Sequence, residues 1–260
     1  MHVFYQSDES KIAIDIENGI RNGEFIPYFQ PIIRGGDREI IGGEVLVRWQ
    51  HPDMGIVQPD CFIPTAERFG LITQMTQSLM RSVSVALTSH RAKIPDGFHI
   101  GFNISASHVE SGELVHDCDK FISDTGKDSD IHLMLELTEH VEIKNPITGP
   151  LLRALEIRGV SLAIDDFGMG YSNLNYLQKH RFSHIKIDKS FTKHVNDCVR
   201  TECIVDCIIR LANKLALSVI AEGIETMEQF IYMKDMGVDY FQGYFFGRPT
   251  LFEDFIVKHW

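Results

Sequence analysis

Two adjacent aspartates at the end of a predicted strand are the residues of this sequence best placed to do chemistry. The stretch Gly159–Asp166 reads GVSLAIDD, and FGMGYSNLNYL follows it. Unpaired charge at the end of an apolar strand is unfavourable by several kcal/mol, so Asp165 and Asp166 require cations or protons nearby. An Asx turn or a helix cap is the commonest use of aspartate at such a place. For the pair alone, that structural role is favoured.

Other polar side chains recur near the ends of further predicted strands and change this balance. In Ile41–Trp49, alternation places Glu44, Leu46 and Arg48 on one face and three apolar residues on the other. The corresponding strand ends carry Asn103, Glu136, Lys186, Glu222 and Gln242. A strand face that packs in a core would carry no charge, so these charged and polar side chains indicate that the strands share a site.

Eight predicted strands position these residues. Helices separate the strands over about 250 residues, which is typical of a (β/α)8 TIM-type barrel. The strands are Phe25–Ile32, Ile41–Trp49, Phe98–Ile104, Ile131–Glu136, Val160–Asp166, Ser183–Asp188, Leu217–Glu222 and Val238–Gln242, and the helices are Ser10–Asn22, Pro59–Phe69, Thr73–His90, Ile147–Arg158, Val199–Leu215 and Met227–Met236. Catalytic side chains of such barrels come from the C-terminal ends of several strands, where the candidates lie. A doubly wound open sheet is the alternative, but its Gly-rich phosphate loop is not visible in the sequence.

The acidic residues outnumber the single lysine of this predicted site. Five carboxylates, one amide and one ammonium call for added positive charge, and an all-oxygen set without histidine favours Mg²⁺ or Mn²⁺ over Zn²⁺ or Cu²⁺. An aspartate pair that bridges would place two ions ~3.5–4 Å apart, the geometry used for in-line displacement at phosphorus. The interpretation is a phosphodiester hydrolase, and the alternative is a set of unrelated strand-end caps.

Lys186 supports a second chemical interpretation. A lysine at the end of the sixth barrel strand is able to form a Schiff base, as in a metal-independent aldolase. The surrounding carboxylates keep its ammonium protonated, which opposes that role. A charged Lys186 better suits holding an attacking water or a phosphate oxygen.

Composition limits the classes of protein. With 260 residues, 44% of them hydrophobic, we expect one domain with a large core. A net charge of -11 argues against a broad surface for a nucleic acid polymer. Five cysteines without a CxxC pair indicate reduced thiols. With neither a membrane-length apolar run nor a signal-peptide pattern, we expect a soluble, cytoplasmic chain without direct membrane contact.

Seven sequence strings together give a specific resemblance. They are GEVLVRW, FNIS, LELTE, IDDFGMGYSNLNYL, IKIDKSF, AEGIET and QGYFFGRP. In this order and spacing, from about Ile12 to Phe255, the chain closely resembles the EAL-domain family of cyclic di-GMP phosphodiesterases. The resemblance implies that residues 1–260 form a single EAL domain. It also implies a modified barrel whose first strand is antiparallel to the others, consistent with the two prolines in Phe25–Ile32.

The resemblance also implies roles for individual residues. The first divalent cation, Mg²⁺ or Mn²⁺, would be held by Glu44, Asn103, Glu136 and Asp165. The second would be held by Asp165 as the bridge, Asp166 and Glu222. The catalytic residues would be Lys186, which contacts the hydrolytic water, Glu222, which takes part in its deprotonation, and Glu44. Substrate contacts would be Gln30 to guanine, Arg48 to phosphate, and Leu46, Asp188 and Gln242.

Regulation and assembly are implied by resemblance alone. Thr138, Glu139 and Glu225 resemble residues that anchor the loop Asp166–Asn173, which links the site to dimerisation in the family. We therefore expect a homodimer. The chain departs from the family at Val45, which should point away from the site, and at Met169, where a lost hydroxyl would weaken loop ordering.

The implied activity is hydrolysis of cyclic di-GMP to linear pGpG. This would lower second-messenger levels in the bacterial signalling that governs biofilm formation and motility, and the chain would be a stand-alone enzyme or the cytoplasmic catalytic part of a larger sensory or membrane protein. A non-hydrolytic cyclic di-GMP receptor or protein-interaction module is the alternative. Inactive members of the family usually lack acidic ligands, whereas this chain keeps each one that can be matched.

Overall fold

The computed structural model describes residues 9–126, 130–138, 148–168, 174–195 and 198–260. Glu139 and Met169 lie outside these ranges. In the described part of the chain, every helix is too short or too polar to cross a membrane.

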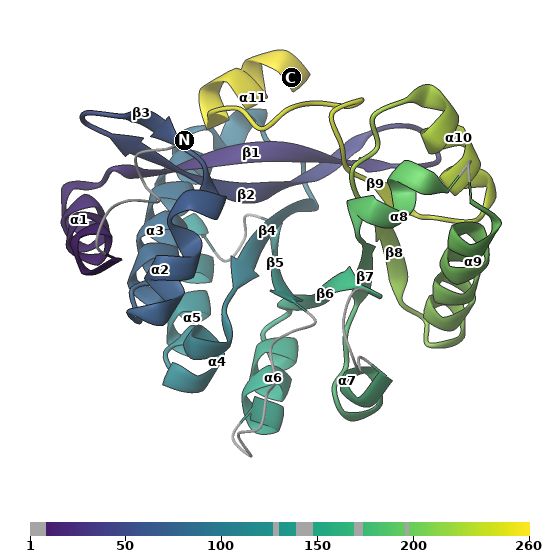
Figure 1. The fold of residues 1–260 in the computed structure, drawn as a ribbon, viewed down its shortest axis with the longest axis horizontal. Helices are drawn as coiled ribbons and strands as arrows, with labels where there is room; N and C mark the ends of the chain where they lie inside the picture. Colours follow the sequence, from purple (N-terminus) through teal and green to yellow (C-terminus); the bar gives the residue numbers. More distant parts are fainter. Residues whose placement is uncertain (1–8, 127–129, 139–147, 169–173, 196–197) are drawn as a thin grey trace.

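Eight strands close into a barrel (Figure 1). They are β1 (Phe25–Arg34), β2 (Ile40–His51), β4 (Phe98–Ile104), β5 (Ile131–Thr138), β6 (Ser161–Phe167), β7 (His184–Ile187), β8 (Ser218–Ala221) and β9 (Tyr240–Phe241). β1 is antiparallel to both of its neighbours, β2 and β9, and the strands from β2 through β4 to β9 are mutually parallel. The predicted barrel with an antiparallel first strand is confirmed.

Two strands are much longer than the rest. β1 has 10 residues and β2 has 12, and their pairing continues to Phe25 and Trp49, well beyond Glu44 at the barrel mouth. A short strand that the sequence analysis did not predict, β3 (Gly55–Val57), pairs with the far end of β2. The β1–β2 ribbon therefore extends past the mouth, and in Figure 1 it runs across the top of the view.

Helices surround the barrel (Figure 1). Those anticipated from the sequence are α1 (Glu9–Asn22), η2 (Pro59–Cys61) with α2 (Ile63–Arg68), α3 (Ile72–Ser89), α6 (Thr148–Ile157), α9 (Val199–Lys214) and α10 (Met227–Asp235). Those not anticipated are η3 (Arg91–Lys93), α4 (Ala106–Ser111), α5 (Leu114–Thr125), α7 (Leu174–Lys179), α8 (Lys189–His194) and α11 (Phe252–His259). The last helix packs on β1, with the rings of Phe29 and Phe252 4.7 Å apart.

Side chains fill the barrel interior in layers, because alternate residues of each strand point inward. The layer at the N-terminal ends of the parallel strands carries His99, His132 and His184. The middle layer is an apolar cluster of Ile32, Met134, Ala163 and Ile220. The layer at the C-terminal ends holds the polar candidates, and residues of opposite parity, including Val45, Ile100 and Phe102, pack in the main hydrophobic core.

Candidate active site

A bulge in β6 brings the two adjacent aspartates to one place. Between the pairs Ile164–Ile185 and Phe167–Ile187, β6 advances three residues while β7 advances two. Asp166 occupies the extra position with a φ of +53°. In a regular strand, neighbouring side chains point to opposite faces, so the bulge is what lets both carboxylates face the site.

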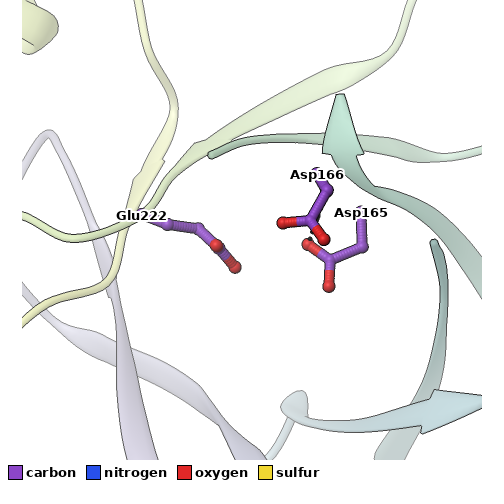
Figure 2. Close-up of side chains that lie close together, drawn as sticks. All are labelled: Asp165, Asp166 and Glu222. Atoms are coloured by element: carbon purple, nitrogen blue, oxygen red, sulfur yellow. Dashed lines mark hydrogen bonds between the residues drawn. The ribbon is translucent and has the colours of Figure 1, made fainter. Parts of the chain in front are cut away.

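Three carboxylates form the tightest group at the mouth. Ligand oxygens of Asp165, Asp166 and Glu222 all lie within 4.8 Å of one another, and Figure 2 shows them projecting into the same space. They come from β6 and from the residue that follows β8. The backbone N–H of Asp166 donates to Asp165 Oδ1 at 2.9 Å, which fixes the first carboxylate relative to the bulge.

Lys186 lies at the centre of a larger carboxylate set. Its side chain is 0% exposed, and its Nζ lies 2.6 Å from Glu222, 3.4 Å from Asp165 and 3.5 Å from Glu44. It also donates a hydrogen bond to Glu136, which is equally buried. One ammonium from β7 thus contacts carboxylates from β2, β5, β6 and the end of β8.

The pKa values of these groups shift for identifiable reasons. Burial lowers the pKa of Lys186, but the carboxylates of Asp165, Glu136, Glu222 and Glu44 outweigh burial and raise it well above its ordinary value. A lysine held so firmly in the ammonium form is a poor Schiff-base nucleophile, which opposes the aldolase interpretation.

Two of the carboxyl groups shift in the direction expected for excess negative charge. Burial, followed by the charge of Glu44, raises the pKa of Glu136 well above its usual range despite Lys186. Burial also raises the pKa of Glu222 to about 8, with a further increase from Asp165. A single ammonium therefore leaves the set short of positive charge.

The residues present fit divalent cations. Among the described residues, Glu136 Oε1 is fully buried without a hydrogen-bond partner, as a carboxylate oxygen reserved for a ligand would be. When all five carboxylates are ionised, they and Lys186 together carry a net charge of -4, which two divalent cations would balance. Oxygen donors without histidine suit Mg²⁺ or Mn²⁺.

Gly101 is a site residue that the sequence analysis missed. A Cβ at this position would lie 2.3 Å from Glu136 Oε1, so any other residue would force that buried carboxylate to move. A glycine inside a predicted strand indicates a close approach of this kind. The glycine that directly precedes the FNIS string therefore could have been predicted to lie close to a site residue.

Amide side chains hold Glu44 in place. Asn103 Nδ2 donates to Glu44 Oε1 at 2.6 Å, and Gln242 Nε2 donates to Glu44 Oε2 at 2.6 Å. Gln242 Nε2 also donates to Gln30 Oε1 at 3.1 Å, and Gln30 Nε2 donates to the Gly247 carbonyl oxygen at 3.1 Å. The structure thus brings Asn103, Gln30 and Gln242 together with the carboxylates.

Leu46 and Arg48 lie on the β1–β2 ribbon. Leu46 lines a cleft of about 620 Å³ that also contacts Asn103 and Thr138. The guanidinium of Arg48 lies 5.6 Å from the Tyr28 ring centroid, and its Nη1 donates to the Val47 carbonyl oxygen. Burial lowers the pKa of Arg48 from its ordinary value. Tyr28 was not predicted as part of the site.

Three remaining candidates lie at its periphery. Thr138 pairs with Asp165 across β5 and β6. Asp188 is buried and its Oδ1 accepts a hydrogen bond from the Ser190 N–H at the start of α8. Glu225 is exposed, and its backbone N–H donates to Gln229 Oε1. The predicted roles of these residues in binding or loop anchoring stay predictions.

Comparison with known proteins identifies the family. The protein-family model described as the EAL domain matches residues 14–249 of this chain. This chain belongs to the EAL domain family. The resemblance recognised from the seven strings is confirmed.

Two similar proteins come from Escherichia coli (strain K12). The probable cyclic di-GMP phosphodiesterase PdeG is 41% identical over 93% of this chain and 48% of its own length. The cyclic di-GMP phosphodiesterase PdeL is 40% identical over 94% of this chain and 67% of its own length. The chain thus spans about half to two thirds of these relatives.

A solved EAL structure shares the fold. The EAL enzyme Bd1971, in its cAMP and cyclic-di-GMP bound form, superposes with a TM-score of 0.90. It is 28% identical, and the match covers 97% of this chain and 69% of that one.

Proposed function

We propose that this EAL domain is a cyclic di-GMP phosphodiesterase that hydrolyses one 3′,5′-phosphodiester bond to give linear pGpG. Relatives named for this activity, at 41% and 40% identity, support the substrate class. The single observation that carries the proposal is the cluster of carboxylates around one buried ammonium, with Glu136 Oε1 left without a partner among the described residues. Such a set calls for cations at a mouth that would meet an anionic phosphodiester.

Two divalent cations, Mg²⁺ or Mn²⁺, fit the residues in the predicted manner. Glu44, Asn103, Glu136 and Asp165 would hold one. Asp165, Asp166 and Glu222, whose oxygens are grouped within 4.8 Å, would hold the other. When bound, the cations would neutralise the phosphodiester and lower the pKa of the attacking water.

The side chains of this domain divide the remaining tasks. Lys186, charged and held by its carboxylate neighbours, donates to the attacking water or to a phosphate oxygen. Glu222 lies 2.6 Å from Lys186 Nζ and accepts the proton of that water, with Glu44 completing the catalytic group. Arg48 meets a phosphate, the buried amide of Gln30 meets guanine, and Gln242 contributes through water or through a neighbouring side chain.

The biological setting forms part of the same proposal. The domain acts as a homodimer in the cytoplasm, alone or within a larger sensory or membrane protein. There it lowers the cyclic di-GMP level that controls biofilm formation and motility.

A product assay tests the activity. The protein is incubated with cyclic di-GMP and Mg²⁺ or Mn²⁺, with and without chelator, and the products are separated by chromatography. We expect pGpG that requires the cation and disappears in Glu44→Gln, whereas Glu253→Gln on α11 leaves it unchanged. Binding of cyclic di-GMP without pGpG under either cation would instead favour the non-hydrolytic receptor.

A further inference from the structure

The contacts of Lys186 indicate a structural task besides its proposed part in hydrolysis. Its ammonium contacts four carboxylates, from Glu44, Glu136, Asp165 and Glu222. These groups belong to strands on both sides of β7, and β2 lies far from it in the order of the sheet. A single buried positive charge therefore links widely separated parts of the barrel mouth.

Without that charge, the four carboxylates would repel one another in a buried place. Removing one partner of a buried ion pair leaves an uncompensated charge, which is far more costly than losing an exposed pair. Two members of the set, Lys186 and Glu136, have side chains that are 0% exposed, so water does little to screen them. Lys186 thus stabilises the arrangement that the proposed cation sites require.

The carboxylate oxygens around Lys186 have two competing partners. The carboxylates that Lys186 contacts are the ones proposed to hold divalent cations, so a cation and the ammonium must share them. The apolar cluster of Ile32, Met134, Ala163 and Ile220 includes the register partner of Lys186 on β8, Ile220. A charged group would withdraw into this cluster only at high cost.

We propose that Lys186 is a built-in counter-ion, which keeps the four carboxylates gathered when no divalent cation is bound and gives up contacts with them when one binds. This inference rests on the proposed function only in its second half. The first half concerns folding stability and holds whether or not the domain hydrolyses cyclic di-GMP.

The first test measures stability without cations. Lys186→Met keeps a chain of similar length without charge, and Lys214→Met, at the exposed end of α9, is the matched control. In chelator we expect the melting temperature of Lys186→Met to fall by on the order of 10 °C, and that of Lys214→Met to stay close to wild type. An unchanged melting temperature for Lys186→Met would overturn the proposal.

The second test measures cation uptake by calorimetry and by the rise in melting temperature with Mn²⁺ or Mg²⁺. Because the competing charge is gone, Lys186→Met should bind the cation about tenfold more tightly than wild type and gain more stability from it. A variant that folds only with the cation would also support the proposal. Equal or weaker binding would overturn it, as would failure to fold even with the cation.

The two tests separate this inference from the proposed function. If wild type takes up neither cation but Lys186→Met is destabilised in chelator, the two-cation function fails and the structural half of the inference stands. If wild type produces pGpG but Lys186→Met is as stable as wild type in chelator, the function stands and the inference fails.

Discussion

Acidification should destabilise this barrel through His184, at the end opposite the candidate active site. Burial, followed by the charge of His99, lowers the pKa of His184 from 6.5 to about 4. Its Nδ1 is buried without a hydrogen-bond partner among the described residues, and the Tyr240 ring of β9 lies 6.1 Å away. The protonated imidazolium would therefore be poorly compensated.

The groups that surround His184 do not supply the missing negative charge. The rings of His99 on β4 and His132 on β5 lie tilted to each other with centroids 5.0 Å apart, and Arg34 of β1 adds a further positive charge that lowers the pKa of His99. Among the described residues, the carboxylate of Asp130 lies 3.4 Å from His132 Nε2, but its side chain is largely exposed.

The size of the effect follows from linkage. A histidine whose folded pKa lies below its unfolded value stabilises the fold above the unfolded pKa and loses that contribution as pH falls toward the folded pKa. With an unfolded pKa near 6.5 and a folded pKa of about 4, the loss begins near neutral pH. Lowering the pH from about 7 to about 5 should cost up to about 2 kcal/mol of unfolding free energy.

Urea unfolding of His184→Gln and wild type at both pH values measures this loss. The variant cannot be protonated there, so its unfolding free energy should fall by about 2 kcal/mol less than that of wild type. His116→Gln, on the exposed surface of α5, should follow wild type. The wild-type minus variant difference cancels the contribution of the active-site carboxyl groups, and a difference that stays constant with pH would refute the reasoning.

The remaining predictions concern the active site. Asp165→Asn should abolish pGpG formation by removing the ligand that we propose both cations share, with an unchanged circular dichroism spectrum; normal turnover would contradict the ligand assignment. Gly101→Ala forces Glu136 to move from a Cβ at 2.3 Å and should cost about 1–3 kcal/mol in urea unfolding and most of the cation affinity in calorimetry. Gln242→Leu removes the 2.6 Å hydrogen bond to Glu44 and should weaken cyclic di-GMP binding in equilibrium dialysis; unaltered affinity would argue against its substrate role.

The parallel strands were predictable because their alternation is regular. In β4, Ile100 and Phe102 pack outward and Asn103 lies at the mouth, as the period of two requires. The same rule fails at Asp166, where alternation alone would place its carboxylate opposite that of Asp165. The bulge is visible only in the pairing of β6 with β7. The local sequence pattern does not predict such pairing, because the two strands are distant segments of the chain.

The helices that were not predicted from the sequence were missed for different reasons. α4, α7 and α8 have 6 residues each, too few to display a helical period. α5 was detectable, because Leu114, Cys118 and Phe121 follow helical spacing and are buried. Gly101 and the amide contacts of Glu44 depend on packing between strands, so the residue types were predictable but their partners were not.

The long β1–β2 ribbon gives the proposed substrate contacts of this domain a backbone held by strand pairing. Specificity in such folds is commonly carried by βα-loops, which must be ordered when a ligand arrives. Here Leu46 and Arg48 extend from paired backbone, with Tyr28 opposite Leu46 in the register. The backbone of these residues loses little conformational entropy when a ligand docks. Changes of ligand preference should therefore come from substituting side chains while the backbone of the ribbon stays the same.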